Sequence, residues 1–135
     1  MNRQGLKASL IVAAAAVGVS GMAVPAFAHH SGAMFESEKE IVLNGTVREF
    51  QYTNPHSWIQ VVVPGASGKS VEWSIETAAP IVLLRAGIKK TAFQPGEKVA
   101  IRVHPMKDGS AGGSLIDAKK ADGTIVSLRG PGITN

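Results

Sequence analysis

The stretch that decides the fold reads SVEWSIETAAPIVLLRAG, from Ser70 to Gly87. Its first part alternates apolar and polar residues, which predicts a strand over 70–76. The alternation breaks at Pro80, a residue that suits the first turn of a helix, and Gly87 stands where a helix is usually capped. We therefore expect a helix of about two turns over 79–86, directly after the strand.

The same two elements predict which side chains face inward. In the strand, Val71, Trp73 and Ile75 share one face, which we expect to be the inner one. In the helix, Ile81 and Leu84 share a face, which Ile88 just after the helix can extend.

Alternating apolar residues bounded by turn signals predict five more strands. These cover 40–50, 57–63, 97–104, 114–119 and 124–128. Within 97–104, alternation places Val99, Ile101 and Val103 inside and leaves Lys98, Arg102 and His104 outside. Gly45 inside the first of them indicates a bend or bulge, by which a strand turns the corner of a small barrel.

The order of these elements indicates the fold class. Three strands, one short helix and two or three further strands form the order of an OB-type barrel. We therefore expect an all-β protein with one short helix, folded as an OB-like small barrel of five or six strands. A β-sandwich is the alternative, and it ranks second because a helix is not expected at that point of a sandwich.

The first residues have the pattern of a secretory signal. Arg3 and Lys7 precede an apolar run over 8–19, and Ala26-Phe27-Ala28 supplies small residues for cleavage. We predict a Sec-type signal peptide over 1–28, a mature chain that begins at His29, and export to the periplasm. The remainder fits one domain over 29–129 and a flexible tail over 130–135.

Composition excludes several classes of function. The chain has no cysteine, so it has neither a disulfide framework nor the ligands of a typical structural zinc site. Its formal net charge is +4, and Arg3 and Lys7 account for two of these charges. We therefore expect no nucleic-acid partner, no membrane partner after signal cleavage, and a monomer. Without a nucleophile elbow or a phosphate loop we expect no enzyme, and copper redox chemistry is the one minor alternative.

The four histidines are the candidate metal ligands: His29, His30, His56 and His104. If cleavage follows Ala28, His29 carries a free α-amine and an imidazole that can chelate one ion together. A second imidazole, from His56 or His104, would complete the nitrogen set called a histidine brace, which suits copper. His30 is a reserve ligand. Each histidine also has a simpler interpretation, as a turn residue or a solvated strand end.

A metal-free ligand face is the competing hypothesis. Trp58 is expected on the outer side of its strand, near Asn54 in the preceding loop and Met106 in a later one. Such a face could bind a small ligand or a protein. Glu72 and Glu76 are expected on the outer side of the next strand, and such carboxylates also occur on an ordinary solvated face.

Several short motifs together resemble a known family. AHHS at the presumed cleavage site, YTNPHSW, LLRAG, PGEKV and KDGS resemble the DUF6152 family of small exported bacterial proteins, whose function is unknown. The resemblance covers nearly all of the mature chain and implies export and one compact domain. It brings no activity, ligand or catalytic residue. It does imply that His29, His30 and His56 are more than signal debris, because they lie in its most specific motifs.

Overall fold

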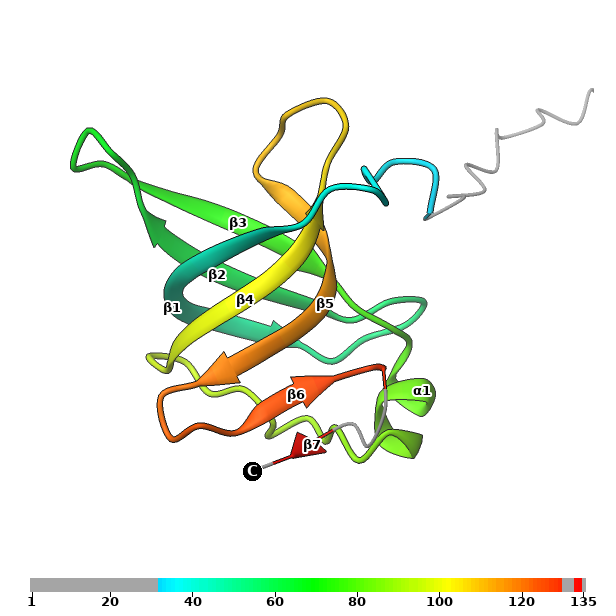
Figure 1. The fold of residues 1–135 in the computed structure, drawn as a ribbon. Helices are drawn as coiled ribbons and strands as arrows, with labels where there is room; N and C mark the ends of the chain where they lie inside the picture. Colours follow the sequence, from blue (N-terminus) through cyan, green and yellow to red (C-terminus); the bar gives the residue numbers. More distant parts are fainter. Residues whose placement is uncertain (1–31, 130–132, 135) are drawn as a thin grey trace, which may run out of the picture.

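The computed structural model describes residues 32–129 and 133–134. Within these residues, seven strands and one helix follow each other along the chain, and Figure 1 shows their arrangement. They are β1 (Ile41–Gln51), β2 (Trp58–Pro64), β3 (Ser70–Glu76), α1 (Pro80–Arg85), β4 (Lys98–Pro105), β5 (Gly112–Lys120), β6 (Ile125–Ser127) and β7 (Ile133–Thr134).

Five of the strands close into a barrel. The order β3-β2-β1-β4-β5 is antiparallel throughout, and a parallel pairing of β3 with the start of β5 joins the two ends. The end of β5 continues along the same edge with β6, which extends the sheet beyond the barrel. This confirms the predicted all-β, OB-like barrel with one short helix.

The barrel interior is filled by the alternate residues of its strands. Val99, Ile101 and Val103 on β4 are buried as predicted, and they meet Ile75 from β3 in one cluster. Trp73 packs against this cluster only partly, whereas Val71 is exposed. The prediction of an inner face on this strand is therefore wrong for Val71, because the β2–β3 hairpin projects past the barrel wall there (Figure 1).

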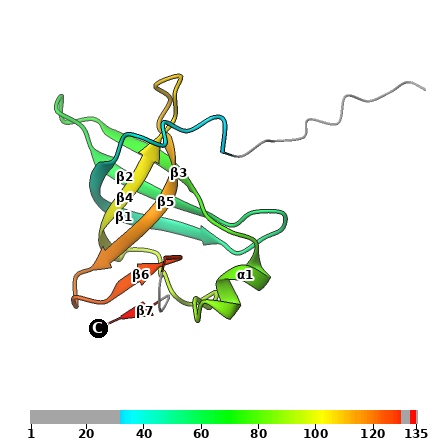
Figure 2. The same ribbon diagram turned by 45° about the vertical axis from the view of Figure 1, so that its right-hand side comes forward.

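Helix α1 follows β3 and precedes β4 in the chain, and it lies at one end of the barrel (Figures 1 and 2). The helix was predicted correctly, and of the three residues predicted to share a face, Ile88 is buried. Leu83 is the helical residue that is buried, while Ile81 and Leu84 are more than half exposed. The hydroxyl of Tyr52 holds the segment in place, 2.9 Å from the carbonyl oxygen at position 80 and 3.1 Å from that at position 88.

Of the bend or bulge predicted at Gly45, the bulge does not occur at that residue. The register between β1 and β2 shifts between Val47 and Glu49 instead. At Gly45 the strands approach closely, because an added Cβ would lie 2.6 Å from the carbonyl oxygen of Val62. Only glycine fits at this position, because there is no space for a Cβ atom.

The two ends of the chain carry the predicted signal peptide and the predicted flexible tail. Residues 1–31, which include the predicted signal peptide, His29 and His30, lie outside the described residues. Within the predicted tail, Ile133 and Thr134 form β7 and pair with Val126 and Ile125 of β6.

Candidate metal and ligand site

The loop that carries His56 is fastened to the end of β3. The N–H of Ser57 donates to the carbonyl of Ala78 at 3.0 Å, and the N–H of Thr77 donates to the carbonyl of Ser57 at 2.8 Å. The Thr77 hydroxyl adds a buried bond of 3.1 Å to the same carbonyl. These bonds continue the β2–β3 ladder beyond the pair of Trp58 and Glu76, so they fix the backbone next to His56.

His56 and Glu76 form a close pair. The Nδ1 atom of His56 lies 2.5 Å from Oε1 of Glu76, and the two side chains are 33% and 8% exposed. A carboxylate only accepts hydrogen bonds, so Nδ1 is the donor, and a neutral imidazole then carries its lone pair on Nε2. Metal-binding histidines are oriented in this way by a carboxylate behind the ring. The arrangement therefore presents Nε2 of His56 as a possible ligand.

A cavity of about 360 Å³ lies beside this pair. Its lining includes His56, Glu76 and Val82, and also Gly32 and Phe35 from the segment before β1. Phe35 is buried and forms an isolated antiparallel bridge with Met106. The bridge holds the start of the described chain at the rim of the cavity that contains His56.

His104 lies elsewhere. Its Nδ1 atom is 2.9 Å from the carbonyl oxygen of Lys39, which only accepts, so Nε2 is the lone-pair nitrogen of the neutral ring here too. His104 pairs with Ser114, and Ser114 pairs with Glu76 on the other side. Two strand spacings, about 10 Å, thus separate the backbones of His104 and Glu76.

Of the four predicted metal ligands, the described part of the chain holds His56 and His104, and it places these two apart; His29 and His30 lie outside it. His56 lines the cavity, and His104 is absent from its described lining. Within residues 32–129 and 133–134 there is no group of three or more His, Cys, Asp or Glu that could hold a metal ion.

The predicted ligand face is only partly present. Trp58 is partly exposed beside Glu76, Asn54 is exposed in the loop, and Met106 packs near Gly112. Trp58 and Asn54 belong to the same end of β2, whereas Met106 follows β4.

The outer carboxylates next to this face are both engaged. Glu72 forms an ion pair of 2.8 Å with Arg48, and Glu76 holds His56. The face thus offers an aromatic ring and amides, but its acidic groups already have partners.

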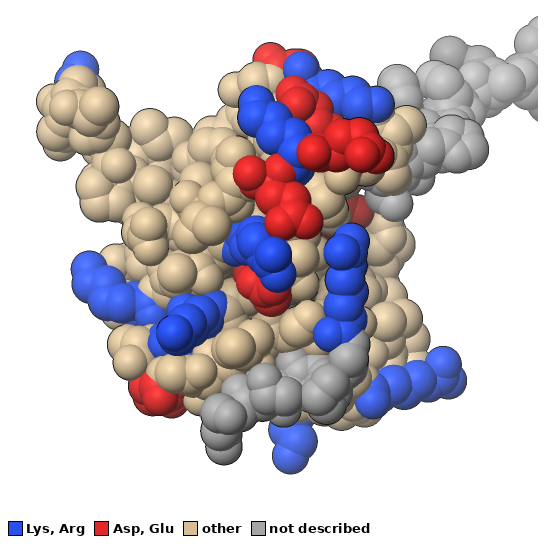
Figure 3. Space-filling model, viewed as in Figure 1, with Lys and Arg blue, Asp and Glu red and all other residues tan. Residues whose placement is uncertain are grey.

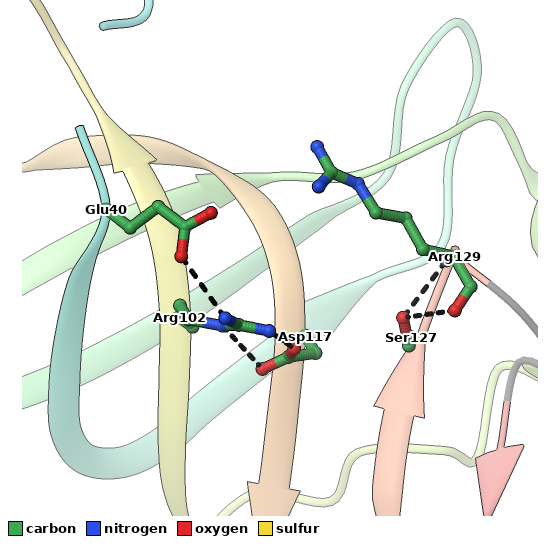
Figure 4. Close-up of polar contacts among 5 residues, drawn as sticks. All are labelled: Glu40, Arg102, Asp117, Ser127 and Arg129. Carbon is green, nitrogen blue, oxygen red and sulfur yellow. Dashed lines mark hydrogen bonds and ion pairs between the residues drawn. The ribbon is translucent and has the colours of Figure 1, made fainter. Parts of the chain in front are cut away.

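A charged cluster that the sequence did not predict lies on the outer face of β4 and β5. Arg102 sits between Glu40 and Asp117, as Figure 4 shows. Hydrogen bonding to Asp117 is the main cause that raises the pKa of Arg102. Figure 3 shows basic and acidic side chains intermingled over this part of the surface. The alternation along β4 placed Arg102 outside, but its partners depend on strand register.

Fold and site together define a small closed β-barrel with a carboxylate-oriented histidine at one cavity. A protein-family model described as a family of unknown function, DUF6152, matches residues 15–116. The chain belongs to this family. No curated protein and no solved structure matches this chain. Among the residues that the structure describes, no helix is long and apolar enough to cross a membrane.

Proposed function

We propose that this is an exported, periplasmic protein that binds copper through its mature N-terminus. The ligands are the α-amine and imidazole of His29, released by cleavage after Ala28, together with Nε2 of His56. The observation that carries the proposal is that Gly32 and His56 line the same cavity.

Chain length supports this combination. Two residues, His30 and Ser31, stand between His29 and Gly32, and the three Cα–Cα steps from His29 to Gly32 span at most about 10–11 Å when extended. Gly32 borders the cavity, so the covalent chain keeps His29 within that distance of its rim. An amine and two imidazoles form a nitrogen set that suits copper, and copper displaces protons from such ligands when it binds them.

His56 is the preferred third ligand over His104. The Glu76 carboxylate lies behind the His56 ring, while His104 rests on a backbone carbonyl outside the described lining of the cavity. A carboxylate increases the basicity of the ring nitrogen that faces a metal. His104 and His30 are reserve ligands, and no catalytic role is proposed.

A metal-free binding module remains the second candidate, because Trp58 is partly exposed beside the same loop. In that case Trp58→Ala abolishes binding of a glycan or peptide while the histidine variants retain it. Quenching of tryptophan fluorescence against a ligand panel measures this directly.

The deciding experiment compares two chains in copper(II) titrations. One begins at His29, and the other carries one additional residue before it. We expect the first to bind copper(II) far more tightly and to give nitrogen-dominated couplings in its EPR spectrum. Equal affinity of the two chains would exclude the N-terminal amine as a ligand.

A matched pair of variants tests the third ligand. His56→Ala is expected to weaken copper binding and to remove one nitrogen coupling, whereas His104→Ala leaves both unchanged. The reverse result would move the site to His104. Intact-mass measurement of protein recovered from the periplasm tests the cleavage site itself.

A further inference from the structure

The side of α1 that faces away from the barrel is apolar. Ile81, Val82 and Leu84 are 54%, 47% and 55% exposed, and Leu83 alone among the helical residues is buried. At about 100° per residue, the three exposed side chains cover an arc of roughly 160° opposite Leu83. Scattered exposed apolar residues are common, but three on one arc form a contiguous patch, which is typical of an interaction surface. We name Ile81, Val82 and Leu84 the α1 patch.

Basic residues accompany the α1 patch. Arg85 lies one turn after Ile81, within the same arc, and Lys89 and Lys90 follow the helix in exposed positions. The sequence between Glu76 and Glu97 contains these three cations and no acidic residue. Within the described part of the chain, no ion pair involves any of the three.

The position of α1 makes this surface accessible. The helix projects at one end of the barrel in both ribbon views (Figures 1 and 2). Toward the same end, Figure 3 shows basic side chains with few acidic neighbours, in contrast to the mixed charges near the opposite end.

From these features we infer that the α1 patch docks on the surface of an anionic lipid bilayer. Proteins bind at a bilayer surface when apolar side chains enter the boundary between headgroups and acyl chains. Neighbouring cations strengthen this binding by their attraction to anionic headgroups. A protein partner is a poorer fit, because three half-exposed side chains cover little of the roughly 800 Å² that each side of a stable protein interface buries.

The expectation of no membrane partner was drawn from the small net charge of the chain, which does not describe the local charge next to α1. A small net charge is an average over the molecule, whereas charges are screened over about 8–10 Å at physiological salt. Three cations next to one apolar patch therefore act together at a surface, whatever the distant acidic residues contribute. This inference does not depend on the proposed copper site.

The test is sedimentation with lipid vesicles, using metal-free protein recovered after expression of the full chain. Vesicles of 30% phosphatidylglycerol in phosphatidylcholine are compared with vesicles of pure phosphatidylcholine. We expect binding to the anionic vesicles that weakens when salt rises from 0.1 to 0.5 M. Equal binding to both vesicles would overturn the inference.

Two pairs of matched variants locate the surface. Each cation near a bilayer contributes about fivefold in affinity, so Lys89→Glu/Lys90→Glu should reduce binding at least about 25-fold. Its control, Lys98→Glu/Lys119→Glu, makes the same change in charge on the outer face of β4 and β5 and should have a much smaller effect. Ile81→Ser/Leu84→Ser removes the apolar part, and its control, which replaces one exposed residue of β1, is Val42→Ser.

These variants also distinguish vesicle binding through the α1 patch from vesicle binding through another part of the protein. All substituted side chains are exposed, so unfolding temperatures should stay close to that of the parent, and any uncleaved signal would be common to every chain. If both charge variants lose binding equally, or if the α1 variants bind like the parent, the α1 patch is not the docking surface.

Discussion

Replacing Gly45 by alanine tests the account of how β1 and β2 approach each other. An added Cβ would lie 2.6 Å from Cγ1 of Val61 and 2.6 Å from the carbonyl oxygen of Val62. Ordinary contacts begin at 3.4 Å, so each distance is about 0.8 Å too short. Val61 is fully buried and the other atom belongs to the backbone, so neither can move aside without disturbing the barrel.

The size of the effect follows from these contacts. Inserting an extra methyl group into a packed region costs about 1–3 kcal/mol, and two fixed neighbours place this case in the upper part of that range. The alanine restricts the unfolded chain, which offsets about 0.4–1 kcal/mol. A net loss of about 2 kcal/mol in the free energy of unfolding corresponds to a fall in Tm of roughly 8–16 °C for a domain of this size.

Thermal unfolding followed by circular dichroism measures the change. Gly32→Ala is the control, because nothing lies within 4 Å of its added Cβ, and its Tm should stay within about 2 °C of the parent. If Gly45→Ala unfolded at the temperature of the parent as well, the close approach of the two strands would not be the reason for glycine at this position.

Three further predictions concern the site and the surface. Glu76→Gln keeps an acceptor for the Nδ1–H of His56 but removes the charge, so copper affinity in a competition titration should fall about 10–100-fold, and an unchanged affinity would argue against the carboxylate as the orienting group. Tyr52→Phe removes the hydroxyl that holds the α1 segment and should cost about 1 kcal/mol in urea unfolding, whereas an unchanged midpoint would show that this bond contributes nothing. Hydrogen bonding from the backbone N–H of Thr124 is the main cause that lowers the pKa of Asp122, so the stabilisation it provides exists above about pH 4 and is lost as pH falls through the lowered pKa. The stability difference between the parent and Asp122→Ala should therefore shrink below about pH 4, and a constant difference from pH 6 to pH 2 would contradict this.

Strand positions were predictable because successive side chains of a strand point to opposite faces, and in the barrel wall one face is buried while the other is exposed. Val99, Ile101 and Val103 followed it and form part of the core. The packed face of α1 was not predictable in the same way. Four consecutive apolar residues, Ile81 to Leu84, carry no contrast between faces, so only contact with the barrel selected Leu83.

The candidate site, too, was predictable from the sequence only in part. Alternation placed Glu76 on the outer side of its strand, and the Asn-Pro sequence placed His56 in a loop. Their contact required the β2–β3 register, which pairs Trp58 with Glu76 and brings the loop back over the end of β3. The nearness of Gly32 depended on the Phe35–Met106 bridge, which joins segments about 70 residues apart.

The sequence by itself determined the order of β1 to β6 and α1, the family motifs and the inventory of possible ligands, because these depend on local periodicity and residue type. Tertiary structure alone decided that His56 is oriented by Glu76 beside the start of the described chain, that His104 rests on Lys39, and that an apolar, basic surface forms on α1. The physical reason is that barrel closure fixes which distant residues become neighbours, and no local pattern records the register at which the strands close.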